Sequence, residues 1–115
     1  MSVADRIDYI EFPSNNRAGT SGFFRAAFGW GITSYGPDYD GLEGAGIDGG
    51  VDQADNRVTA TMAVIRTQDL DDAERRVVKA GGVITRPQFD FPGGRRFHFR
   101  EPGGNELAVY VTRPE

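Results

Sequence analysis

The chain has 115 residues, 38% hydrophobic and 26% charged, which is the size and composition of one small globular domain. Its formal net charge is −4 with no basic cluster, which argues against a nucleic-acid partner, and no apolar run approaches the ~18 residues of a membrane span. There is no cysteine, which excludes disulfides, thiolate metal sites and a thiol nucleophile, and which fits a cytoplasmic protein.

The first half of the chain predicts a strand, a helix and then several short strands. Residues 7–12 have strand-like alternation and follow the N-terminus directly, so we expect no signal peptide. Polar residues at 14–16 can cap a helix that Gly29 ends. Residues 32–47 alternate glycines with aromatics and predict short strands and turns, whereas residues 49–57 have little apolar content and predict a linker.

The same pattern then restarts. Residues 59–66 predict a strand, Asp69 can cap a second helix, and Gly81 ends it. Three further strands are expected at residues 83–91, 95–101 and 106–112. The chain therefore predicts an α/β (α+β) protein of two βαβββ-type modules, at about residues 5–52 and 58–113 of a single domain spanning residues 1–115.

Three segments, in this order and at this spacing, resemble motifs of the vicinal-oxygen-chelate superfamily, which includes lactoylglutathione lyases, bleomycin-resistance proteins and extradiol dioxygenases. They are residues 23–30, similar to the "FY…FGW" helix end, residues 80–83 after the second helix, and residues 101–105, similar to the "DPxGN" turn with Glu in place of Asp. The resemblance implies one curved mixed sheet around a cavity, with the helices outside. It also implies that two chains pair as a homodimer.

The resemblance further implies where a metal would bind, and the residues at those places are unsuitable. The family's ligands, usually His or Gln, His, and Glu, fall on Tyr9, Met62 and Ala108. A fourth falls within residues 41–50, where two acids offer no unique alignment. A divalent metal needs several nitrogen or oxygen donors, which Met and Ala cannot supply. We therefore expect no metal and no other cofactor.

Strand alternation extends these positions into a polar lining. The family's ligand position faces the cavity, so residues on the same strand face should do so too, while Phe97 and Phe99 pack under the helices. The spacing of His98 from Ala108 is that of an active-site Tyr in extradiol dioxygenases, which makes His98 the candidate catalytic residue. The expected ligand-binding residues are Tyr9, Glu11, Met62, Arg96, Glu106, Ala108 and Tyr110.

Several of these residues have a purely structural alternative. A lone histidine such as His98 is more often a satisfied structural residue than a catalyst, although a nearby Glu would favour a proton shuttle. Arg96 could bind an anionic group, or form a salt bridge to a Glu across the strands. The rings of Tyr9 and Tyr110 could stack on a flat ligand, or simply line a half-filled barrel.

On balance, the sequence favours a metal-independent small-molecule binding or resistance-type protein. We expect its ligand to be an aromatic or cationic metabolite, and the acidic net charge favours a cationic one. The alternative is a cofactor-free enzyme, such as an isomerase, lyase or cyclase, in which His98 acts as acid and base. A metal-dependent glyoxalase or dioxygenase is disfavoured by the residues at the ligand positions. We expect a cytoplasmic homodimer with neither a nucleic-acid nor a membrane partner.

Overall fold

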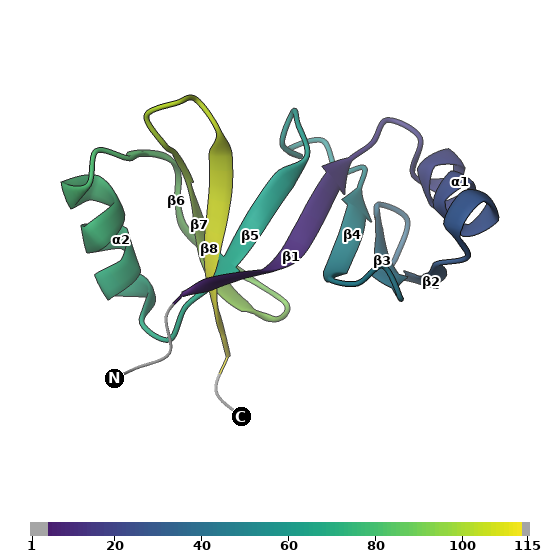
Figure 1. The fold of residues 1–115 in the computed structure, drawn as a ribbon, viewed down its shortest axis with the longest axis horizontal. Coiled ribbons are helices and arrows are strands. Elements are labelled where there is room, and N and C mark those ends of the chain that lie inside the picture. Colours follow the sequence, from purple (N-terminus) through teal and green to yellow (C-terminus); the bar gives the residue numbers. More distant parts are fainter. Residues whose placement is uncertain (1–4, 114–115) are drawn as a thin grey trace. The chain divides into compact units, whose positions relative to one another are not determined.

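The structure, a computed structural model, describes residues 5–113 (Figure 1). The elements follow the order βαβββ twice, so the predicted α+β class with two such modules is confirmed. The described residues form two compact units. The N-terminal unit comprises residues 9–62, and the C-terminal unit comprises residues 5–8 and 63–113. Within the described range, neither helix combines the length and the apolarity needed to cross a bilayer.

The N-terminal unit holds one helix, three whole strands and residues 9–13 of a fourth. The elements are β1 (Arg6–Pro13), α1 (Arg17–Phe28), β2 (Gly31–Ser34), β3 (Tyr39–Glu43) and β4 (Asp48–Asp52). Parallel pairing joins β1 to β4, and antiparallel pairing joins β4 to β3 and β3 to β2.

The prediction of a linker at residues 49–57 is wrong for its first part, because β4 occupies it. A Cβ atom at Gly49 would lie 2.9 Å from the carbonyl oxygen of Ile10 on β1, so glycine is needed for the close approach of these two strands. The glycine that lowers the apolar content of this segment, and so suggests a linker, is therefore required for the packing of β4 against β1.

Helix α1 begins and ends as its sequence predicts. The Asn16 side chain accepts a hydrogen bond from the Gly19 amide at 3.1 Å, and Gly29 ends the helix in the left-handed region with φ 75°. The Phe24 ring packs 5.1 Å from that of Phe12 on β1, measured between centroids. Because Phe12 faces α1, Tyr9 and Glu11, which alternate with it along β1, lie on the sheet face away from the helix.

The C-terminal unit repeats this plan. Strand β5 pairs in parallel with β8, and β8, β7 and β6 follow one another in antiparallel pairs. The sequence predicts β6 and β8 to the residue, whereas β5 is shorter than the expected 59–66. The elements are β5 (Met62–Arg66), α2 (Leu70–Lys79), β6 (Val83–Phe91), β7 (Gly94–Arg100) and β8 (Glu106–Thr112).

The core of this unit lies between α2 and one face of its sheet. Leu70 and Ala73 of α2 are buried together with Phe97, Phe99 and Val109 of β7 and β8. The predicted position of both phenylalanines under the helix is therefore confirmed. Alternation along β7 places His98, which lies between the two phenylalanines in sequence, on the opposite face of the sheet.

The turn between β7 and β8 is closed by a side chain. The Glu101 carboxylate accepts hydrogen bonds from the amides of Gly103 at 2.6 Å and Asn105 at 3.0 Å. These backbone donors hold the pKa of Glu101 below its ordinary value. The Glu that replaces Asp in the turn motif thus keeps a turn-closing role.

Candidate functional site

The N-terminal unit carries a hydrogen-bonded chain of two phenols and a carboxylate on the sheet face opposite α1. The hydroxyls of Tyr9 and Tyr39 are hydrogen-bonded to each other, and Tyr39 Oη donates to Glu11 Oε2 at 3.1 Å. A phenol has one proton, so Tyr9 donates to Tyr39 and Tyr39 to Glu11. The structure thus brings Tyr9 and Glu11 together through a residue that sequence analysis did not include in the site.

Burial determines the protonation state of Tyr39 in this series of hydrogen bonds. Glu11 is 5% exposed. Burial, and then the charge of Glu11 and the neighbouring Tyr9, raise the pKa of Tyr39 far above the ordinary value of a phenol. Tyr39 is therefore a neutral hydrogen-bond donor at physiological pH.

The strand register identifies the fourth ligand position implied by the resemblance. Two residues beyond Tyr9, β1 pairs Glu11 with Gly50 of β4. In the other module, Met62 of β5 is the equivalent of Tyr9, and two residues beyond it Val64 pairs with Ala108 of β8. Gly50 is therefore the equivalent of Ala108 in the other module, which the glycine-rich sequence around it could not reveal.

The space in which a side chain would stand at Gly50 is filled by the two phenols. A Cβ atom there would lie 2.0 Å from Tyr39 Oη and 2.5 Å from Tyr9 Oη. In a family member with a carboxylate at this position, that space would hold the ligand side chain. Here it holds the Tyr9–Tyr39 hydrogen bond instead.

The residues at the four ligand positions do not fit a divalent metal. They supply a phenol that is already hydrogen-bonded, no side chain, a thioether and a methyl group, whereas such metals take carboxylate, imidazole or thiolate donors. Among residues 5–113, no group of three or more His, Cys, Asp or Glu residues is placed to hold a metal ion. The positions are Tyr9, Gly50, Met62 and Ala108.

The C-terminal unit carries His98 on the sheet face opposite α2, where its side chain is 3% exposed. The Arg96 guanidinium lies against it, with Nη2 and Nε 2.9 and 3.2 Å from His98 Nε2. On the other side, His98 Nδ1 lies 3.5 Å from Glu106 Oε2. A guanidinium can only donate, so Nε2 accepts and the ring proton is assigned to Nδ1, facing Glu106.

The remaining sequence-predicted residues of this unit have defined partners. Glu106 accepts a hydrogen bond from Thr85 Oγ1 at 2.8 Å. Tyr110 Oη donates to the Asp8 carboxylate, 2.9 Å from Oδ2. Ala108 is fully buried and pairs directly with His98. The structure therefore groups Arg96, Glu106 and Ala108 around His98, while the Tyr110 hydroxyl bonds to Asp8.

Two further residues lie beside His98, both on β6, and neither was predicted from the sequence. The Arg86 guanidinium lies over the Phe89 ring, 3.8 Å from its centroid, and that ring in turn lies edge-on to His98 with centroids 5.6 Å apart. The signal that could have indicated them is Pro87, since proline inside a strand marks a bulge or an edge.

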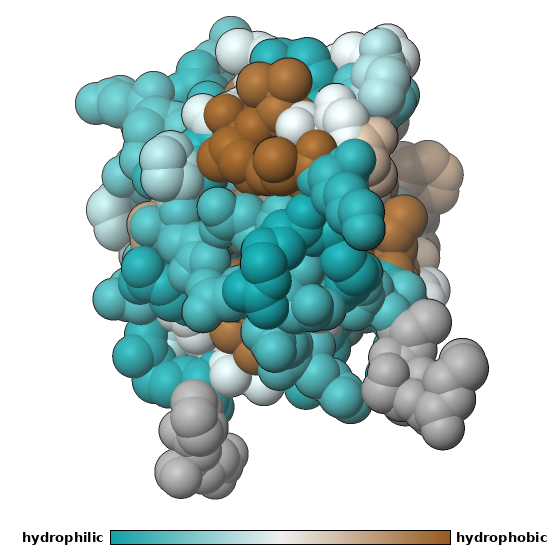
Figure 2. Space-filling view, turned by 90° about the vertical axis from the view of Figure 1, so that its left-hand side faces the viewer, coloured by the Kyte–Doolittle hydropathy of each residue, from teal (hydrophilic) through white to brown (hydrophobic). Residues whose placement is uncertain are grey.

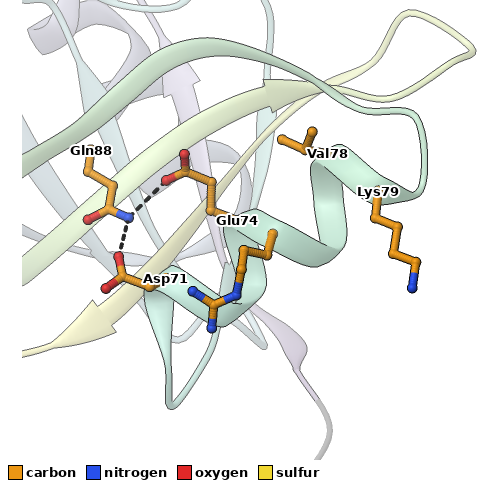
Figure 3. A pocket seen from close by; sticks show the side chains of 6 residues that line it. Asp71, Glu74, Val78, Lys79 and Gln88 are labelled. Atoms are coloured by element: carbon orange, nitrogen blue, oxygen red, sulfur yellow. Dashed lines mark hydrogen bonds between the residues drawn. The ribbon is translucent and has the colours of Figure 1, made fainter.

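A pocket of about 500 Å³ lies at α2, and none of its lining residues is a predicted site residue. Gln88 of β6 lines this pocket and donates hydrogen bonds to Asp71 and Glu74 of α2, both at 2.8 Å (Figure 3). Figure 2 shows the side on which α2 lies in Figure 1: a hydrophilic surface with an apolar patch. Val78 and Val83 are exposed apolar residues of this unit.

Comparison with known families agrees with this geometry. The profile of the Glyoxalase/Bleomycin resistance protein/Dioxygenase superfamily matches residues 6–109. The chain belongs to this superfamily. The family implied by the sequence motifs is therefore confirmed, and the match covers both modules. No curated protein matches the chain in sequence.

Solved structures with the same fold differ widely in what they do. A structure described as an NAD-dependent benzaldehyde dehydrogenase from Legionella pneumophila has a TM-score of 0.74 at 13% identity, covering 96% of this chain and all of that one. Methylmalonyl-CoA epimerase from Mycobacterium tuberculosis has a TM-score of 0.70 at 14% identity, covering 94% and 88%. The Mn(II)-bound glyoxalase from Novosphingobium aromaticivorans has a TM-score of 0.67 at 14% identity, covering 97% and 43%. At such identities the likeness shows the fold alone.

Proposed function

We propose that this member of the superfamily binds a small organic molecule without a metal ion, as a binding or resistance-type protein. The observation that carries the proposal is the residue set at the four metal-ligand positions. Two of these, Gly50 and Ala108, have no donor atom, and Met62 has only a thioether. The fourth, Tyr9, already shares its hydroxyl with Tyr39.

The phenol chain supports an aromatic ligand with polar groups. The rings of Tyr9 and Tyr39 lie on the sheet face opposite α1, and tyrosines combine a large apolar surface with a hydroxyl. At the end of the chain, the buried carboxylate of Glu11 accepts a hydrogen bond from Tyr39 and so fixes the orientation of the two phenols.

A cofactor-free enzyme using His98 is the second candidate. It is supported by the imidazole's position between Arg96 and Glu106, since a base oriented by a carboxylate is a common catalytic arrangement. However, the lone pair of Nε2, the atom that would take the proton, accepts from Arg96. Proton abstraction would require Arg96 to move first, so we favour binding over catalysis.

The test combines metal analysis with ligand binding. Protein purified without chelator is analysed for zinc, nickel, iron and manganese, and aromatic fragments are screened by ligand-observed NMR with and without EDTA. We expect substoichiometric metal and fragment binding that EDTA does not change. One metal ion per chain that is lost in Tyr9→Ala, or binding that EDTA abolishes, would refute metal-independent binding.

Replacing His98 separates the two candidates. A binding protein should keep most of its affinity for the fragments in the His98→Ala variant. An enzyme should lose turnover while binding is largely intact.

A further inference from the structure

The feature that the proposed function does not use is the unusual path of β6. Its register with β7 pairs Ile84 with Phe99, Arg86 with His98 and Phe89 with Arg96, so one extra residue of β6 lies on each side of Arg86. These are β-bulges, and the second one contains Pro87, which has no amide proton to donate to the ladder.

The bulges change the direction in which the side chains point. In a regular strand, residues three apart such as Arg86 and Phe89 would point to opposite faces. With the extra residue between them, each pairs directly with a residue of the His98 face, and residues paired in this way share a face. The cation–π contact between the two side chains, 3.8 Å from Cζ to the ring centroid, agrees with this.

A second guanidinium lies at the same ring. Arg96 Cζ is 5.7 Å from the Phe89 centroid and 5.8 Å from that of Phe91. Two positive side chains thus flank one phenyl ring beside His98, whose Nε2 accepts from Arg96 and adds no charge in that state. The carboxylate facing His98, that of Glu106, is itself bonded to Thr85.

Arg86 is a half-buried cation beside the Phe89 ring. In the part of the chain that the structure describes, its guanidinium makes no ion pair or hydrogen bond, and its contact is the Phe89 ring. A partly desolvated guanidinium that is held in one orientation has already lost much of the freedom that anion binding would cost. By contrast, Arg95 next to Arg96 is exposed and paired with Asp90 and Gln88.

We propose that Arg86, which the bulges of β6 place against Phe89, and Arg96 of the neighbouring strand β7 bind an anionic group of the ligand, a carboxylate or a phosphate. The inference rests on the proposed function, because it assigns part of a small organic ligand. It favours an acid over the cationic metabolite that the net charge suggests. Phe89 contributes by fixing Arg86 and by offering ring area to an aromatic body beside the anion.

The experiment compares four probes of similar size on the purified protein: benzoate, phenyl phosphate, benzyl alcohol and benzylamine. Dissociation constants are measured from amide shifts in ¹H–¹⁵N spectra at constant ionic strength, with EDTA present. We expect both anions to bind at least about tenfold more tightly than the neutral and cationic probes, because charge-assisted bonds are the strong ones. Tighter binding of phenyl phosphate than of benzoate identifies a phosphate as the natural group, and the reverse identifies a carboxylate.

Matched variants test the residues. Arg86→Met should weaken benzoate binding about tenfold or more and leave benzyl alcohol unchanged, while Arg86→Lys should fall in between, because it keeps the charge but not the fork. Arg95→Met, from the same pair of strands, is the control and should bind benzoate as the parent does. The dispersion of the amide spectrum shows that each variant is folded.

Two outcomes overturn the anion site: equal affinity for benzoate and benzylamine, or unchanged benzoate affinity in a folded Arg86→Met variant. Metal-free binding of benzyl alcohol with no preference for anions would refute the anion site and leave the proposed function standing. Benzoate binding that appears only when zinc or manganese is added would refute the proposed function instead.

Discussion

Substitution of Gly50 is the sharpest test of the idea that two phenols occupy the space that a side chain at this family ligand position would take. In Gly50→Ala, the new Cβ would lie 2.0 Å from Tyr39 Oη, 2.3 Å from its Cζ and 2.5 Å from Tyr9 Oη. Gly50 does not have a positive φ, so alanine can adopt its backbone and the effect comes from these contacts. The Tyr39 hydroxyl must move by about 1 Å, which breaks its 3.1 Å bond to Glu11.

The expected cost follows from three contributions. Overpacking costs about 1–3 kcal/mol. Losing a hydrogen bond to a buried carboxylate costs roughly 1.5–3 kcal/mol. The smaller entropy of the unfolded alanine variant returns about 0.4–1 kcal/mol. Since such values are not additive, we expect Gly50→Ala to lower the free energy of unfolding by about 2–4 kcal/mol, or Tm by roughly 8–15 °C.

The chain supplies a matched control one strand away. Gly41 is the register partner of Gly50, and a Cβ there would also meet a tyrosine, 2.7 Å from Cε2 of Tyr35. That ring is 67% exposed and can turn into solvent, so Gly41→Ala should change the free energy of unfolding by less than about 1 kcal/mol. Urea denaturation followed by circular dichroism measures both variants. Equal stabilities, or a larger loss at Gly41, would refute the reasoning.

Four further predictions follow from single side chains and from the resemblance. Because the pKa of Tyr39 is raised in the folded state, its contribution to stability is complete below the ordinary phenol pKa of about 10 and is lost as pH rises above it. In urea denaturation at several alkaline pH values, Tyr39→Phe should flatten this loss of stability. Because the pKa of Glu101 is lowered, its contribution is complete above about pH 4.5 and is lost in acid, so Glu101→Gln should lower Tm at neutral pH with a difference that vanishes near pH ~3. His98→Phe should fold but lose about 1–3 kcal/mol in urea, since Arg96 loses its acceptor; unchanged stability would count against the contact. We also propose a homodimer, and sedimentation should give twice the 12.6 kDa chain mass at micromolar concentration.

The fold was predictable because its signals are local. Asn16 and Asp69 cap the helices, Gly29 and Gly81 adopt positive φ after them, and the turn at Glu101 closes on itself. Each signal depends on a few neighbouring residues, which a single sequence displays. The face of His98 was predictable for the same reason, since alternation on a regular strand needs only a reliable turn to set the register.

What could not be predicted depends on contacts between distant segments. Tyr39 joins Tyr9 over 30 residues, and neither its surroundings nor its spacing indicates that partner. Strand β4 has only one β-branched residue, Val51, to mark it as a strand, because neighbouring atoms fill the space of side chains at Gly49 and Gly50. Long-range pairing therefore hid both the phenol chain and the fourth ligand position.

The family motifs guide the interpretation of some positions and not of others. At Gly50 and Ala108 the family motifs identify the positions, and the residues there have no side-chain donor atom. The family motifs do not indicate a role for Arg86, because bulges in β6 bring this arginine to the sheet face of His98. If the Arg86 variants bind benzoate as the parent does while the Gly50 variants behave as expected, the packing of the phenols at Gly50 stands without an anion site. If both sets behave as expected, the experiments support fixed phenols in the N-terminal unit and fixed guanidinium groups in the C-terminal unit, each by its own measurement.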